Sequence, residues 1–250
     1  MKQLLIYERP LALNRTQHRH LRIKPLLENF EFARGLNSVP LTTVEFAPAA
    51  RDFPIVFTGE GEDAYGAGMP AALLGLSGDA NLFVETDGRW ASDTYVPAFF
   101  RRYPFVVANQ DASPDNFTVC IDTPYLATGE DGLKLFEESG EDAPALTRAL
   151  GYLADYQTAV QRTQGFMQQL RDSKLLVPRT IKVERADSEA QTLSGFQVVD
   201  EARLHKLAGR DLAKLSKTGA LGLLYAHVLS LGNIQRLSAR LDLHSCARRR

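Results

Sequence analysis

The hydrophobic pattern of the chain changes period near Pro124, and this change constrains the fold more than any other feature. Before Pro124, apolar residues form short runs, such as 55–57 and 105–108, that turn-forming residues separate. Such runs are typical of buried strands joined by tight turns. In 145–171, apolar residues recur at steps of three and four, which predicts one long amphipathic helix. We therefore expect an α+β fold, with a mainly antiparallel sheet in the N-terminal half packed by long amphipathic helices from the C-terminal half.

Turn and helix-cap residues predict the remaining elements. Ser77 to Ala80 have turn chemistry between the apolar runs 71–76 and 82–84, which predicts a hairpin. Pro97 is suited to the start of a one- or two-turn helix that Pro104 ends. Val177-Pro178 is expected to stop the long helix, and Asp200 to cap a helix through 207. The other predicted elements are strands at 117–122, 181–184 and 195–199 and a final helix at 220–241.

The length of the chain fits either one large domain or two small ones, and the lack of a repeat or linker favours one. The chain has 250 residues, 44% of them hydrophobic and 24% charged, which suffices for a substantial core. We find no internal repeat and no low-complexity linker. The predicted organisation is a single domain over 1–250, with an irregular arm at 1–40, a sheet-rich part at 41–124 and a helix-rich part with returning strands at 125–250.

Charge and hydropathy exclude several classes of partner. A net charge of -1 gives no global field to attract nucleic acid. No window approaches the 18 apolar residues that a membrane span needs, and the first residues lack the apolar core of a secretion signal. Cys120 lies in a predicted strand far from Cys246, so we expect a buried thiol and a reducing compartment. These observations predict a cytoplasmic protein with no membrane span.

No short catalytic or cofactor motif is present. The chain lacks the phosphate-binding, zinc-protease and nucleophile-elbow signatures, so no catalytic residue and no cofactor are assigned. The histidines His18 and His20 lie among four cations without a carboxylate or thiol at ligand spacing, so no metal site is predicted. His227 has Leu224 and Leu231 at helical spacing, which indicates a core residue.

The stretch 69–108 combines strand-like runs, the only Trp, paired arginines and three prolines. Guanidinium groups beside aromatic rings can hold carboxylates, phosphates or peptide termini. In the structural alternative, Trp90 fills the core, one arginine covers the sheet, and another pairs with Asp87, Asp93 or Asp122. Both interpretations stay open from the sequence. The candidate ligand-binding residues are Arg89, Trp90, Arg101, Arg102, Tyr103 and Asp122.

Several segments together resemble the bacterial SapC family, named for a surface-layer-associated protein and unrelated to the transporter permease of the same name. They follow one another along nearly the whole chain. Among them are ERP, HRHLRIKP, FARGLNSVPL, PAALLGL, NLFVETDGRW, YVPAFFRRYPFVVA, VCID, GFQVVDEARL and YAHVLSLGNIQRL. Family members in many proteobacteria are encoded near TonB-dependent receptors, halogenase-like proteins and cupin-like proteins, which implies a shared uptake or modification system. The resemblance supplies no catalytic residue.

Three functional hypotheses follow. The first is a non-enzymatic cytoplasmic binding or accessory protein of a nutrient-uptake or surface-associated system, with a peptide or another protein as its partner. The second is an enzyme without a short motif that acts on peptides or amino-acid derivatives, for which Arg101, Asp122 and His227 are the first residues to mutate. The third is a structural component of a surface layer.

Overall fold

A computed structural model of the chain describes residues 6–24, 29–59, 68–76, 80–109, 117–127, 131–185 and 188–247. In this part of the chain the protein is α+β, its sheets are antiparallel and its helices lie mostly in the C-terminal half, as predicted. The loops expected at 59–68 and 109–116 and most of the connection 77–80 lie outside the described residues.

The largest sheet joins strands from both halves of the chain. Its five strands run in the order β3-β5-β4-β10-β9. The two strands expected to return after the long helix are longer than predicted and form a hairpin, in which β10 also pairs with β4. The strands are β3 (Ser38–Pro40), β4 (Ile55–Thr58), β5 (Pro70–Leu73), β9 (Leu176–Arg185) and β10 (Ser188–Val199).

Two smaller sheets contain strands from residues 1–40, the segment that we expected to be irregular. Strand β1 (Pro10–Ala12) pairs with β7 (Phe117–Asp122), which pairs in turn with β6 (Phe105–Asn109). Strand β2 (Arg22–Ile23) pairs with β8 (Leu133–Lys134). The described part of the first 40 residues is therefore held against the body of the protein, because β1 lies in register with β7 from Pro10 opposite Asp122.

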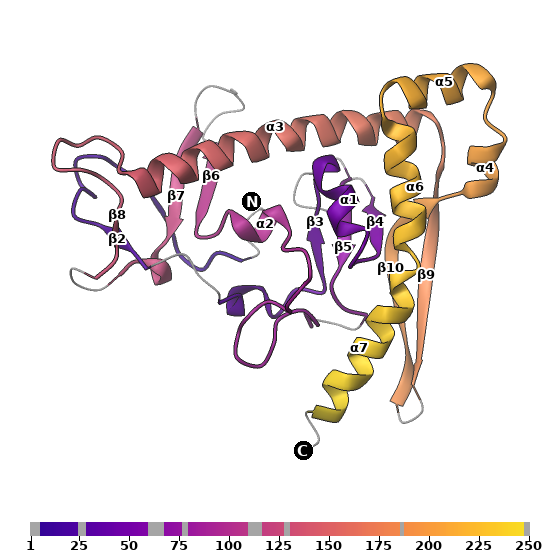
Figure 1. Ribbon diagram of the computed structural model, residues 1–250, viewed down its shortest axis with the longest axis horizontal. Helices are drawn as coiled ribbons and strands as arrows, with labels where there is room; N and C mark the ends of the chain where they lie inside the picture. Colours follow the sequence, from indigo (N-terminus) through magenta and orange to yellow (C-terminus); the bar gives the residue numbers. More distant parts are fainter. Residues whose placement is uncertain are drawn as a thin grey trace.

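The long predicted helix is present as α3 (Pro144–Asp172). Its 29 residues give a length of about 44 Å. Its first half buries Leu146 and Leu153 in the core of the three-stranded sheet, and its second half buries Phe166 and Leu170 in the core of the five-stranded sheet. In Figure 1 it crosses the molecule from β6 and β7 to α5 and α6. One helix thus covers both cores.

The other helices are all shorter than α3. Four α-helices, α2, α4, α6 and α7, correspond to the expected helical segments, and Asp200 caps α4 by accepting from the backbone N–H of Arg203, as predicted. The α-helices besides α3 are α1 (Phe46–Ala49), α2 (Ala98–Arg101), α4 (Glu201–His205), α5 (Gly209–Lys217), α6 (Ala220–Ser230) and α7 (Asn233–Ala247). The 3-10 helices are η2 (Glu31–Ala33), η3 (Thr43–Glu45) and η4 (Thr123–Tyr125).

The hairpin predicted for 71–76 and 82–84 is wrong in its second strand. Both edges of β5 are already occupied, by β3 and β4. The segment 82–84 therefore follows the end of β5 irregularly, with the N–H of Leu82 donating to the carbonyl of Leu74 at 2.9 Å. Val84 forms only an isolated bridge with Trp90.

One predicted helix is divided, and the residues expected to stop another lie within a strand. The helix expected at 220–241 is divided into α6 and α7, which leaves α6 at an angle in Figure 1. At the division, the Asn233 amide donates to the carbonyls of Ala50 and Phe53 at 2.8 and 3.3 Å. Helix α3 ends at Asp172, before Val177-Pro178, and Pro178 lies within β9. A proline is tolerated there because β9 is an edge strand.

Candidate functional site

Trp90 is a core residue rather than a binding residue. Its side chain is 9% exposed, and its indole N–H donates to the carbonyl of Tyr95 at 3.1 Å. The ring stacks on Phe83 with centroids 5.8 Å apart and meets Phe53 at 6.4 Å. The structural alternative therefore holds for Trp90, since a buried indole needs a hydrogen-bond acceptor and has one here.

Arg102 is buried among aromatic rings. It is 4% exposed, and its guanidinium carbon lies 4.0 Å from the Phe99 ring centroid and 5.1 Å from that of Tyr156. A desolvated guanidinium over aromatic faces contributes about 2 kcal/mol. Its placement makes Arg102 part of the packing between α2 and α3.

Arg89 points outward from a turn. Its Nε lies 3.3 Å from the carboxylate of Asp87, which is the pairing that the structural alternative expected. Both side chains are more than half exposed, so this ion pair contributes little to stability.

Asp122 anchors the N-terminal segment. It was one of three acids considered as the partner of an arginine, and among the described residues it binds backbone N–H groups and a tyrosine hydroxyl instead. The carboxylate is fully buried and accepts the backbone N–H of Arg9 at 2.7 Å and of Glu8 at 3.1 Å. It also accepts the hydroxyl of Tyr103 at 3.0 Å. The pairing of β1 with β7 brings these donors to Asp122, and three donors satisfy the buried charge without a cation.

Arg101 is the exposed cation of the cluster. Its Nη2 donates to the Tyr95 hydroxyl at 2.8 Å, and its guanidinium lies 5.5 and 5.7 Å from the ring centroids of Tyr95 and Tyr152. Tyr95 is fixed in turn by a 3.1 Å bond to the buried Glu45 carboxylate. No ion pair with Arg101 occurs in the part of the chain that the structure describes, so a positioned guanidinium is available to a ligand.

An aromatic cavity of about 210 Å³ adjoins Arg101. We call it the aromatic pocket. It lies beside α2, which Figure 1 places between the two larger sheets. Of the six predicted site residues, Arg101 and Tyr103 line it, whereas Arg89, Trp90, Arg102 and Asp122 do not. The lining residues are Asn29, Phe30, Phe32, Phe100, Arg101, Tyr103 and Tyr125.

The turn at Gly88 fixes one wall of the aromatic pocket. Gly88 has φ +85°, and its carbonyl accepts the backbone N–H of Phe30 at 2.7 Å. A Cβ at this position would lie 2.9 Å from Oδ1 of Asn29, so both the backbone conformation and the close approach require glycine. On the adjoining wall, Phe32 stacks on Tyr103 with centroids 4.0 Å apart. The turn at Gly88 therefore helps to position the wall.

Tyr125 gives the aromatic pocket a polar group. It is 9% exposed, and its buried hydroxyl has no hydrogen-bond partner among the described residues. Burial raises the pKa of Tyr125 to about 12, so the phenol stays protonated at neutral pH and can donate. Burial and the neighbouring Asp122 carboxylate also raise the pKa of Tyr103. The Tyr103 hydroxyl already donates its hydrogen bond to Asp122.

The sequence did not single out five of the lining residues. Phe30 and Phe32 lie in the segment expected to be irregular, Phe100 lies in the predicted one- or two-turn helix, and Tyr125 lies outside the predicted elements. A cluster formed from residues near 30, 100 and 125 depends on tertiary contacts, so periodicity could not reveal it. The one available signal was the density of aromatic residues at those three places.

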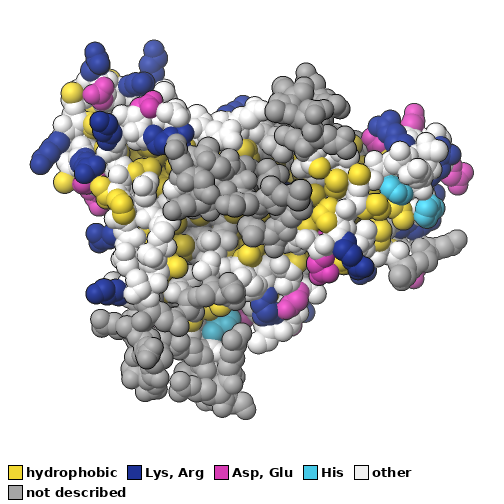
Figure 2. All heavy atoms as spheres, turned by 180° about the vertical axis from the view of Figure 1, so that it is seen from behind, with side chains coloured by type: hydrophobic (Ala, Val, Ile, Leu, Met, Phe, Trp, Pro, Cys, Tyr) yellow, Lys and Arg dark blue, Asp and Glu magenta, His cyan; other side chains and the backbone are white. Residues whose placement is uncertain are grey.

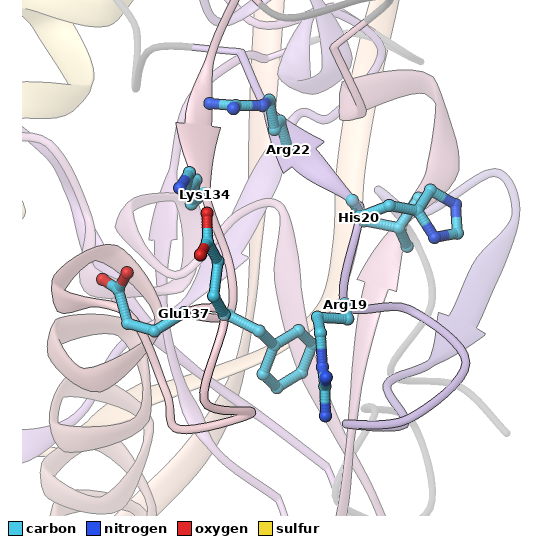
Figure 3. A pocket seen from close by; sticks show the side chains of 8 residues that line it. Arg19, His20, Arg22, Lys134 and Glu137 are labelled. Carbon is cyan, nitrogen blue, oxygen red and sulfur yellow. The ribbon is translucent and has the colours of Figure 1, made fainter.

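A second cavity, of about 480 Å³, lies beside β2 and β8 and carries charges of both signs. Figure 3 shows its labelled side chains spread around the hollow, with His20 directed away from Glu137. Arg22 donates to the carbonyl of Gly132 at 3.2 Å. Because the cations do not meet at one point, this cavity is a weaker candidate than the aromatic pocket.

The described side chains on the face opposite to Figure 1 carry charges of both signs. Figure 2 shows Lys and Arg beside Asp and Glu at both ends of that face, with groups of hydrophobic side chains between them. The described residues contain no group of three or more His, Cys, Asp or Glu placed to hold a metal ion. None of the described helices has the length and apolar character of a membrane span.

Fold and site together define an α+β protein with antiparallel sheets and a small aromatic cavity beside α2. The family model of SapC matches residues 13–237, which is most of the chain, and the protein belongs to the SapC family. Comparison with curated proteins and with solved structures gives no match.

Proposed function

We propose that this protein is a non-enzymatic binding or accessory protein that holds a peptide or a segment of a partner protein in the aromatic pocket. The volume of about 210 Å³ is the observation that carries the proposal. It is below the range of about 300 to 1,000 Å³ that holds whole small-molecule ligands. A pocket of this size suits one anchor side chain, and such anchors dominate the affinity of many protein interfaces.

The contacts of the enzyme candidates also support binding. Arg101 bonds Tyr95, Asp122 bonds Tyr103 and the N-terminal backbone, and His227 bonds Ile55 and Val199. The described hydrogen bonds of these three residues form separate networks in different elements. A shared reaction centre would need them to converge. Turnover of a peptide or amino-acid derivative in a metabolite screen would support the enzyme alternative instead.

The cellular setting is part of the same proposal. The family resemblance supports a role in a nutrient-uptake or surface-associated system, and the composition supports a cytoplasmic location. Cell fractionation tests this setting, and we expect the protein in the cytoplasmic fraction. Recovery with the surface layer would contradict the location and favour the structural surface-layer alternative.

Affinity purification from native lysate tests the binding function. We expect Arg101→Glu to lose a protein or peptide that co-purifies with the wild type, because the substitution reverses the charge beside the aromatic pocket. Arg89→Glu is the matched control, since Arg89 is an exposed arginine of the same stretch whose side chain pairs with the exposed Asp87.

Two results would contradict the proposal. One is recovery of the bare chain across growth conditions. The other is equal recovery of the partner with both variants, provided that circular dichroism shows both to be folded.

A further inference from the structure

The described residues that line the aromatic pocket offer hydrogen-bond donors, and none of them is a carboxylate. Tyr125 has a phenolic donor without a described acceptor, and Arg101 is a cation without a described anion. Asn29 already uses its carbonyl oxygen to accept the N–H of Glu31 at 2.8 Å. A ligand that complements this lining presents an acceptor, and beside a guanidinium the strongest acceptor is a carboxylate.

The apolar part of the lining favours a ligand with an aromatic ring. Five of the seven lining side chains are aromatic. Rings prefer stacked or edge-to-face partners, and Tyr103 and Tyr125 are already edge to face with centroids 5.1 Å apart. A cavity of about 150 Å³ holds benzene. The aromatic pocket, at about 210 Å³, therefore has room for one ring with a small polar group.

We propose that the aromatic pocket binds the C-terminal aromatic residue of a peptide, with its free carboxylate accepting from the Tyr125 hydroxyl and from Arg101. This inference rests on the proposed function and names its ligand. A C-terminal aromatic residue carries a ring and a carboxylate within one residue. A free aromatic amino acid also carries an ammonium group, for which the described lining residues supply no carboxylate.

Trp90 provides the assay. It is the only Trp, and its ring lies 5.5 Å from Phe30 and 5.6 Å from Phe100, both of which line the aromatic pocket. Its fluorescence can be titrated with Trp-free peptides. The probes are acetyl-Ala-Ala-Phe with a free carboxylate, the same peptide with a C-terminal amide, acetyl-Ala-Ala-Ala, and free phenylalanine.

We expect the acetyl-Ala-Ala-Phe acid to bind about tenfold more tightly than its amide, because a hydrogen bond to a charged group contributes that much. The alanine peptide and free phenylalanine bind more weakly than the acid. Tyr125→Phe keeps the ring and removes the hydroxyl donor. We expect it to weaken binding of the acid peptide about tenfold and to leave the affinity for the amide peptide unchanged. It does not lower the melting temperature, because the lost hydroxyl has no described partner.

Arg101→Gln is the second test variant, and Arg89→Gln is its control. We expect the Arg101 variant to lose most of the preference for acid over amide and the Arg89 variant to retain it. Equal affinities of the wild type for acid and amide, or no binding of any probe, would overturn the ligand assignment. The binding function would still stand if Arg101→Glu lost its partner in the lysate experiment, so the two proposals fail separately.

Discussion

His227 lies where β4, β10 and α6 meet. It is fully buried, with Nδ1 2.8 Å from the carbonyl of Ile55 and Nε2 accepting the N–H of Val199 at 3.1 Å. Since Nε2 accepts, Nδ1 carries the proton and donates to Ile55. The prediction that His227 is a core residue is confirmed. A neutral imidazole is required here, because a protonated Nε2 would face the N–H of Val199.

This geometry predicts that stability falls with acid. Burial lowers the pKa of His227 from 6.5 to about 4. Because the folded pKa is depressed, the unfolded state binds more protons between pH 6.5 and 4. Neutral His227 therefore makes its full contribution to the free energy of unfolding above about pH 6.5. As pH falls toward 4, about 3 kcal/mol of this contribution is lost. Urea unfolding at pH 7, 6 and 5 measures it.

The control for this effect is His205→Gln, since His205 is exposed. The control should keep the pH dependence between 7 and 5, and His227→Gln should reduce it. Wild-type stability that does not change over this interval would contradict the assignment.

Single residues show where sequence reasoning succeeds and where it stops. Trp90 was weighed correctly as a possible core residue because apolar size alone favours burial. The role of Asp122 was not predictable, because its donors come from Glu8 and Arg9, more than 110 positions earlier. The aromatic pocket was found only in part, through Arg101 and Tyr103, because its other walls come from distant segments.

At the scale of elements, the spacing of apolar residues along the sequence predicted the long helix and most strands. It did not locate the division between α6 and α7, because Leu224, Leu237 and Leu241 keep a helical spacing through it and all are buried. The division is set by Asn233, whose amide binds carbonyls about 180 residues earlier. Side chain–backbone bonds over such separations leave no periodic signal.

Asn233→Ala is therefore expected to destabilise the fold by about 1 to 3 kcal/mol, because it leaves the carbonyls of Ala50 and Phe53 without this donor. Urea unfolding of the purified variant measures the change. Gln235→Ala, two residues along α7 at an exposed position, should change stability by less than about 0.5 kcal/mol. Equal effects of the two substitutions would show that Asn233 does not anchor α7.

At the scale of the whole molecule, α3 packs on both cores, and this supports the prediction of a single domain. We expect the two larger sheets to unfold as one unit. Hydrogen exchange at increasing urea should give the same free energy of opening for slowly exchanging amides of β7 and of β4. A three-stranded sheet that opens at lower urea than the five-stranded sheet would indicate two separable domains.

Hydrogen bonds join segments that are far apart in the chain, and they determine when the main sheet can form during synthesis. The N–H of Ile55 donates to the hydroxyl of Ser230, 175 positions later, and β4 pairs with β10. At about 5 to 20 residues per second, a ribosome needs roughly 9 to 35 seconds to add those 175 residues. For most of that interval, until Ser188–Val199 is made, the apolar strand β4 has emerged without its neighbour β10. The main sheet is therefore completed only after β10 is synthesised. Until then one edge of β4 is unpaired, which exposes the nascent chain to aggregation.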